Sequence, residues 1–192
     1  MGNLVVAPPR RVAFFLRPAL WLARRLTGKD PLPARLLARF PKGAVAAGLF
    51  ELGAPHAPRD LDARILAVAR VVASAVGGCP FCIDMNAATW REAGLSASEL
   101  EGLLNLDRER WECLAPRERI AALYAEVLSR TPVELDASLV DALGAHFSEK
   151  ETVVLAFTIA QVNFWTRFNQ GLGVPAAGFF DESACRLPGQ RS

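Results

Sequence analysis

Two cysteines separated by two residues, Cys79 and Cys82, are the residues of this sequence best suited to chemistry. Pro80 follows the first cysteine, and proline is favoured at the first position of a helix. The pattern therefore predicts that Cys79 caps a helix and that Cys82 lies in its first turn. Unpaired backbone N–H groups and the positive end of the helix dipole meet there, and such surroundings favour thiolate over thiol. The spacing predicts a reversible dithiol/disulfide couple.

The cysteine pair also allows two other interpretations. Two cysteines in an apolar helical bundle can simply be buried and inert. A zinc site needs four clustered ligands, and the remaining cysteines and histidines stand alone in the sequence, at Cys113, Cys185, His56 and His146. A thioredoxin-like site would need a strand before the pair, and the pattern before it is helical. The sequence therefore favours the redox couple over a metal site.

The hydrophobic spacing is helical throughout the chain, and no segment alternates as a strand would. It predicts helices near residues 10–27, 34–40, 44–52, 60–76, 79–93, 96 onward, 116–130, 135–146 and 148–171. The segment 60–76 is apolar on nearly all sides, which is typical of a helix in the middle of a bundle. Gly77-Gly78 should end it directly before the cysteine pair. The fold class that we expect is all-α, a single helical bundle.

Length and composition narrow the function classes. The 192 residues suit one compact protomer. The 52% of apolar residues indicates either helices that are buried on most sides or an apolar face covered by a partner subunit. A net charge of +2 leaves no broad basic surface for nucleic acid. No apolar run is long enough for a membrane span. The segment 10–25 is both basic and apolar, so two alternatives stay open for it: a helix that lies in a membrane interface or a helix that packs on the chain itself. Without a secretory signal we expect a cytoplasmic location and no disulfide framework.

Residues 62–67 and 77–86 resemble the core of the AhpD-like, carboxymuconolactone decarboxylase family, in which a buried helix leads through a small-residue turn into Cys-x-x-Cys. Further similar segments are 117–119, 124–126, 146–148 and 163–169. The resemblance covers about residues 44–173. It implies an N-terminal helical extension (1–43) packing on an AhpD-like core (44–174), a C-terminal tail (175–192), and an AhpD-like helical bundle assembled as a homo-oligomer.

The resemblance also implies roles for the residues around the pair. Cys82 would attack a peroxide or disulfide, and Cys79 would resolve it by closing the bridge. A separate dithiol donor would supply the electrons, and no metal or organic cofactor is implied. Redox members of the family usually add a relay glutamate twelve residues before the first cysteine and a relay histidine four residues after the second. These positions hold Ala67 and Asn86 here, and neither side chain is a general base near neutral pH.

Other polar side chains have to be weighed as replacements for the relay. Asn86 lies one helical turn after Cys82 and can orient a water or donate to a sulfur. Asp84 points elsewhere around the helix and would need a neighbouring helix or subunit to bring the site to it; otherwise it is a solvated surface charge. Glu51 and Glu118 are candidates from outside the local motif. The site residues that the sequence predicts are Cys82, Cys79, Asn86 and Asp84.

The function that the sequence predicts is that of a thiol-disulfide oxidoreductase or alkylhydroperoxidase-like antioxidant protein, a peroxidase acting on a small-molecule peroxide or disulfide. Two alternatives stay open. One is an enzyme of the carboxymuconolactone decarboxylase type, whose chemistry needs no cysteine pair. The other is a non-catalytic helical oligomer, which the loss of both relay residues would suit.

Overall fold

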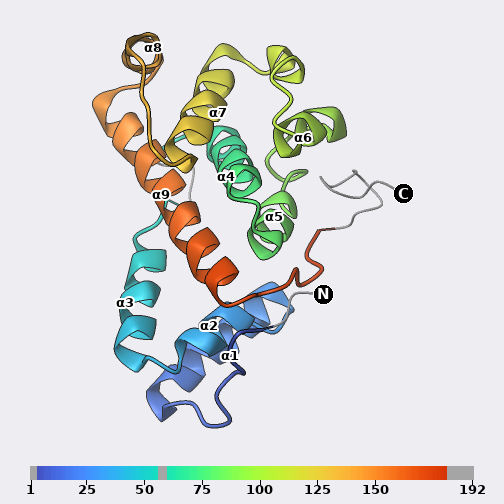
Figure 1. The fold of residues 1–192 in the computed structure, drawn as a ribbon, viewed down its shortest axis with the longest axis vertical. Coiled ribbons are helices and arrows are strands. Elements are labelled where there is room, and N and C mark those ends of the chain that lie inside the picture. Colours follow the sequence, from blue (N-terminus) through green and yellow to red (C-terminus); the bar gives the residue numbers. More distant parts are fainter. Residues whose placement is uncertain (1–3, 56–59, 181–192) are drawn as a thin grey trace.

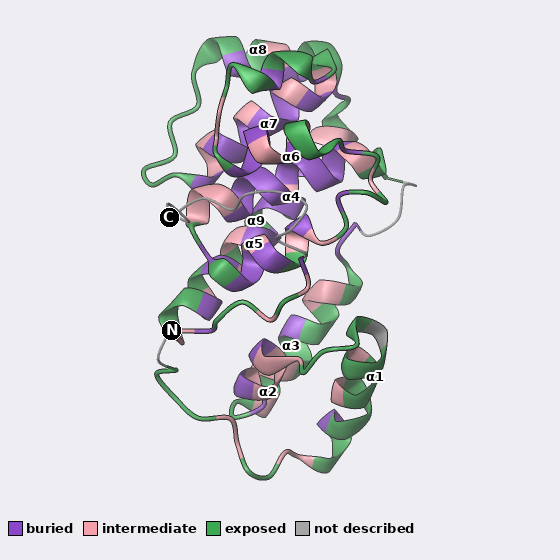
Figure 2. Cartoon of the chain, turned by 90° about the vertical axis from the view of Figure 1, so that its right-hand side faces the viewer, coloured by how far each residue is buried: buried purple, intermediate pink, exposed green. Residues whose placement is uncertain are grey.

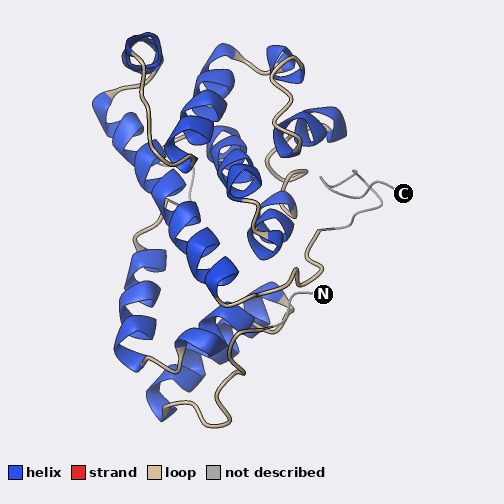
Figure 3. Cartoon of the chain, in the orientation of Figure 1, coloured by secondary structure: helices blue, strands red, loops and turns tan. Residues whose placement is uncertain are grey.

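The computed structural model of the chain describes residues 4–55 and 60–180. Every regular element in these residues is a helix, and they contain no strand (Figure 3). This confirms the all-α prediction. In chain order the helices are η1 (Phe14–Leu16), α1 (Arg17–Thr27), α2 (Leu32–Leu37), α3 (Pro41–Leu52), α4 (Ala63–Gly77), α5 (Pro80–Ala87), α6 (Ala97–Leu104), η2 (Arg110–Cys113), α7 (Pro116–Ser129), α8 (Ala137–His146) and α9 (Glu149–Gly171).

Helix α4 is the central element of the bundle, packed against α7, α9, α5 and α6 (Figure 1). Its residues are buried on nearly all sides (Figure 2), and Val68 and Val72 have no exposed surface. Burial of this apolar surface is the main favourable contribution to its stability. Asp62 caps the helix by accepting a hydrogen bond from a backbone N–H in the first turn. Gly78, with φ of 64°, ends the helix in the left-handed conformation that glycine tolerates. The predicted central helix and its glycine stop are therefore confirmed.

Several predicted helix ends are wrong, and prolines explain most of the differences. Helix α1 starts later than residue 10 because Pro18 fits only the first helical turn. The helix expected over 44–52 begins earlier, at Pro41, which opens α3. Helix α5 ends at Ala87 rather than near residue 93, and a series of turns follows. The Asn86 amide there donates to the Cys82 carbonyl oxygen at 2.9 Å, a local bond of the kind that competes with helix continuation.

Helices α1, α2 and α3 gather at one end of the molecule, beside the C-terminal end of α9 (Figure 1). Many apolar side chains in this N-terminal part are exposed, among them Phe14 of η1, Trp21, Phe40 just before α3, Leu49 and Leu52. None of the described helices combines the length and the apolar character that a bilayer crossing demands.

The ends of α4 and α9 meet at Gly77. A Cβ atom added there would overlap the side chain of Thr166 on α9. The Gln170 amide of α9 also donates to the Gly77 carbonyl oxygen at 2.6 Å. The absence of a side chain at position 77 therefore lets α9 approach the turn that carries the cysteine pair.

We expect Gly77→Ala to lower the free energy of unfolding by about 1–3 kcal/mol, the usual cost of forcing a further carbon into a packed site. Gly144→Ala is the matched control, because a Cβ atom at this position of α8 meets nothing within 4 Å and alanine favours a helix. Urea denaturation of both variants measures the difference. A Gly77→Ala protein as stable as the control would contradict the close contact of α4 with α9.

Candidate active site

The cysteine pair lies where the sequence predicts. Cys79 is the N-cap of α5 and Pro80 is its first residue. The backbone N–H of Cys82 donates to the Cys79 sulfur at 3.2 Å. Both thiols are free and buried, with 0% of Cys79 and 1% of Cys82 exposed. The helix start thus holds two neighbouring sulfurs away from bulk water.

The surroundings give the two thiols different acidities. The Cys79 thiol donates to the Cys82 sulfur, and this bond lowers the pKa of Cys82 to about 7 although burial opposes it. That value includes the smaller contributions of the Asn169 amide, 3.5 Å from the Cys82 sulfur, and of the Thr166 hydroxyl, which also lower the pKa. Donation to Cys82, together with burial, raises the pKa of Cys79 well above its usual value. Cys82 therefore ionises first, and Cys79 keeps its proton.

Thr166 and Asn169 are site residues that the sequence analysis did not single out. Each is 1% exposed, and the Thr166 hydroxyl and the side-chain amide oxygen of Asn169 have no other hydrogen-bond partner among the described residues. Buried polar atoms normally have partners, so these two are placed for the chemistry of the neighbouring sulfur. The signal in the sequence was weak, since it consisted of two polar residues three apart in an apolar helix.

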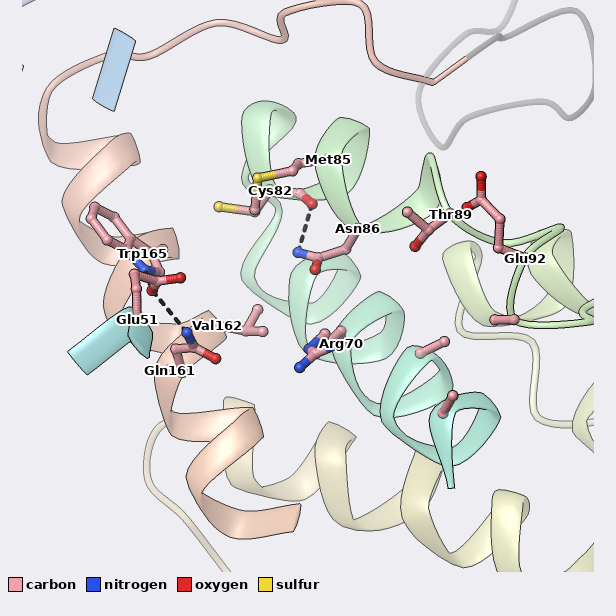
Figure 4. A pocket seen from close by; sticks show the side chains of 13 residues that line it. Glu51, Arg70, Cys82, Met85, Asn86, Thr89, Glu92, Gln161, Val162 and Trp165 are labelled. Atoms are coloured by element: carbon pink, nitrogen blue, oxygen red, sulfur yellow. Dashed lines mark hydrogen bonds between the residues drawn. The ribbon is translucent and has the colours of Figure 1, made fainter. Parts of the chain in front are cut away.

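The Cys82 sulfur opens into a pocket of about 410 Å³ between α3, α4, α5 and α9 (Figure 4). A cavity of this size suits a small organic molecule. Apolar side chains form part of the wall, including Val162 and the half-buried Trp165. The polar and charged residues that line it are Glu51, Arg70, Asn86, Thr89, Glu92 and Gln161.

Both positions that the resemblance assigns to relay residues line this pocket. Ala67 faces it from α4 and Asn86 from α5. The Asn86 amide donates to the Ser74 hydroxyl and to the Cys82 carbonyl oxygen, both at 2.9 Å. The predicted proximity to Cys82 is therefore present, but the amide N–H groups bind a hydroxyl and a backbone oxygen rather than the sulfur.

Asp84 is buried and does not line the pocket. Its carboxylate accepts hydrogen bonds from the backbone N–H groups of Ala177 and Phe180, both at 2.8 Å. The interpretation of Asp84 as a solvated surface charge is thus wrong. The segment that it holds runs from the end of α9 over α5, where Val174 and other apolar residues pack around Cys79. Asp84 therefore holds the segment that follows α9 in place over the cysteine pair.

Glu51 reaches the pocket from the last turn of α3. One of its carboxylate oxygens accepts hydrogen bonds from the Gln161 amide at 2.8 Å and from the Trp165 indole N–H (Figure 4). Arg70 lies close enough to feel the Glu51 charge, which counteracts the lowering of the Arg70 pKa by burial. A carboxylate with a fixed orientation therefore shares the pocket with Cys82.

The remaining candidate residues lie elsewhere. Glu118 is bound by an arginine in the first turn of α4, with 2.7 Å between nitrogen and oxygen, and does not line the pocket. Cys113 is exposed, and His146 ends α8 as predicted. His56 and Cys185 fall outside the described residues. Within the described part of the chain, no three His, Cys, Asp or Glu side chains are grouped so that they could hold a metal ion.

Comparison with known proteins places this geometry in context. No protein-family model matches the chain. The uncharacterized protein YnjA of Escherichia coli (strain K12) is 32% identical over 187 residues, which cover 96% of this chain and 98% of YnjA. A peroxidase-related protein from Ralstonia eutropha JMP134 with an alkylhydroperoxidase AhpD core has a TM-score of 0.77 and 18% identity, over 91% of this chain and 93% of that one.

A second solved structure is a cysteine-to-alanine variant of the debrominase Bmp8 in complex with 2,3,4-tribromopyrrole. It has a TM-score of 0.73 and 21% identity, over 88% of this chain and 90% of that one. These two structural likenesses show that the bundle has the AhpD-like fold, as the resemblance implied.

Cys79→Ala and Asn169→Leu should each raise the pKa of Cys82 above about 7, because each removes a hydrogen bond that stabilises the thiolate. The rate of alkylation at Cys82, followed by peptide mass spectrometry, should therefore reach its half-maximum at higher pH and be lower at neutral pH. Asn105→Leu on the exposed end of α6 is the control and should leave the profile unchanged. A wild-type midpoint at the ordinary thiol value of 9.0 would contradict the assignment.

Proposed function

This chain is related to YnjA over nearly its whole length and belongs to the AhpD-like family, and we propose that it is a thiol-disulfide oxidoreductase that reduces a small organic hydroperoxide at Cys82. The observation that carries the proposal is the unequal pair of sulfurs. Cys82 has a lowered pKa and faces a pocket, while Cys79 remains a thiol hydrogen-bonded to it. A nucleophile and a resolving thiol are the two parts that such a reaction requires.

The reaction begins when the Cys82 thiolate attacks the outer oxygen of the hydroperoxide. A sulfur–oxygen bond forms, the oxygen–oxygen bond breaks, and the alkoxide leaves as the alcohol after it takes up a proton. Cys82 is then a sulfenic acid. The Cys79 thiol attacks this sulfur, water leaves, and a disulfide closes between the two residues. A separate dithiol supplies the two electrons that restore both thiols.

Burial supports a small electron donor. Cys79 has no exposed surface, and Cys82 is reached through a pocket of about 410 Å³. A dithiol therefore has to enter the pocket and attack the Cys82 sulfur of the disulfide, which expels the Cys79 thiolate. Free thiols of this kind persist in a reducing compartment, so a cytoplasmic location fits the proposal.

A second candidate function is the reductive debromination of a small aromatic compound. The likeness to the Bmp8 structure with a bound tribromopyrrole favours it, and Trp165 provides an aromatic wall for such a ligand. The pair would supply two electrons: hydrogen would replace bromine on carbon, bromide would leave, and the Cys79–Cys82 disulfide would form. The same sulfur chemistry thus serves both candidates.

The two alternatives left by the sequence receive less support. A non-catalytic helical oligomer gives no reason for a nucleophilic sulfur with a lowered pKa beside a pocket. An enzyme of the carboxymuconolactone decarboxylase type would make no use of the resolving thiol.

With tert-butyl hydroperoxide and dithiothreitol, we expect peroxide turnover that Cys82→Ser abolishes, because the attacking sulfur is gone. In a single turnover without donor, the wild-type chain should form the Cys79–Cys82 disulfide, and Cys79→Ser should stop at the sulfenic acid. Mass spectrometry distinguishes these products, and a parallel reaction with tribromopyrrole and bromide detection tests the second candidate. Cys113→Ser, which alters an exposed thiol outside the pocket, is the control. Turnover that survives Cys82→Ser would refute the proposal.

The proposal includes self-association of the chain. Large apolar side chains are exposed on α1, α3 and α9, with exposed fractions of 63% for Trp21, 65% for Leu49 and 43% for Phe164. Exposed apolar surface of this extent is typical of protein interfaces. Light scattering coupled to gel filtration should give a multiple of 20.8 kDa, and Leu49→Lys should lower the mass by placing a charge in the interface. A monomer at micromolar concentration would contradict self-association.

A further inference from the structure

The proposed reaction needs a proton donor close to Cys82. The alkoxide expelled from a hydroperoxide is a strong base, so its departure is assisted by a nearby acid. Near neutral pH, arginine and asparagine do not exchange protons readily, which excludes Arg70 and Asn86. The Cys79 thiol keeps its proton and is consumed in the next step. The carboxylates that line the pocket are Glu51 and Glu92.

Position and orientation favour Glu51 over Glu92. Glu92 is exposed and belongs to the turns after α5. Glu51 is half-buried, and hydrogen bonds from Gln161 and Trp165 hold its carboxylate. Figure 4 shows the Cys82 sulfur pointing toward the side of the pocket where Glu51 and these two partners lie. An acid that is already oriented loses little entropy when it acts.

The opposite wall leaves space for this arrangement. Helix α4 lines the pocket with Ala63, Ala67 and Arg70, so no second carboxylate from that helix repels Glu51. One turn further along α4, Arg70 provides a positive charge that interacts with Glu51. The pocket thus accommodates one oriented carboxylate that enters from α3.

We propose that Glu51 is the proton-transfer group of the Cys82 site. The inference rests on the proposed function. Glu51 accepts the proton of the Cys82 thiol, directly or through a water, and so generates the attacking thiolate. When the oxygen–oxygen bond breaks, the electron pair leaves on the alkoxide, and the Glu51 carboxyl returns the same proton to give the alcohol. Glu51 is then ionised again, and no further oxidant or reductant is involved in this step.

The experiment compares two reagents that attack the same sulfur. tert-Butyl hydroperoxide has a basic leaving group that needs a proton, whereas methyl methanethiosulfonate releases a weakly basic sulfinate that does not. At pH 7, close to the pKa of Cys82, a substantial share of Cys82 is ionised in both variants, and the proton that Glu51 relays is still held in the site. Glu51→Gln should then slow reduction of the hydroperoxide about a hundredfold, within the usual range for a lost general acid, and change the rate of thiosulfonate modification little. Glu134→Gln, in an exposed loop, is the matched charge control and should alter neither rate.

A second variant makes the test independent of the fold around Glu51. In the double variant Glu51→Gln/Ala67→Glu, a carboxylate enters the same pocket from α4, and hydroperoxide reduction should recover. The proposal is overturned if Glu51→Gln leaves the hydroperoxide rate unchanged. It is also overturned if both reagents slow equally, since Glu51 would then only position Gln161 and Trp165. A wild-type chain that reacts with the thiosulfonate but not with hydroperoxide overturns the proposed peroxidase function together with the role of Glu51.

Discussion

The hydrogen bond between the Cys79 thiol and the Cys82 sulfur is the interaction on which the site depends. It makes two chemically identical side chains unequal, because stabilising one sulfur as an anion fixes the proton on the other. The bond exists because Cys79 is a cap residue outside the helix while Cys82 is within its first turn. Gly78 and Pro80, on either side of Cys79, allow the chain to pass from α4 into α5 in this geometry.

Burial alone would work against this site, because a thiolate is less stable away from water. Helix α9 offsets this cost because it supplies buried hydrogen-bond donors to the Cys82 sulfur, the side chains of Asn169 and Thr166. The same helix carries Gln161 and Trp165, which orient a carboxylate on the other side of the pocket. Packing of α9 on α4 therefore serves both stability and sulfur chemistry, and the missing side chain at Gly77 is what permits it.

The sequence predicted the parts of the site that local patterns determine, and it missed those that depend on how helices face one another. The end of α4 and the capping role of Cys79 follow from glycine, proline and spacing alone. Periodicity could not show that Asn169 faces Cys82, and the sequence offered Glu51 only as one of two candidates beside Glu118, since each contact joins helices far apart in the chain. Asp84 was misplaced for the same reason, because its partners belong to a segment with no pattern of its own.

The loss of the family's relay residues at positions 67 and 86 does not remove acid–base capacity from the pocket. The reactive sulfur is tied to the start of α5, since the cap position of Cys79 places its thiol against Cys82. A carboxylate is less constrained, because it acts through its proton and needs only a fixed position within reach of the leaving group. Four helices border the cavity, so a carboxylate from α3 can occupy a place that one from α4 would otherwise take. The family's relay motif lies on two adjacent helices, so it does not include a carboxylate that a third helix brings into the folded site.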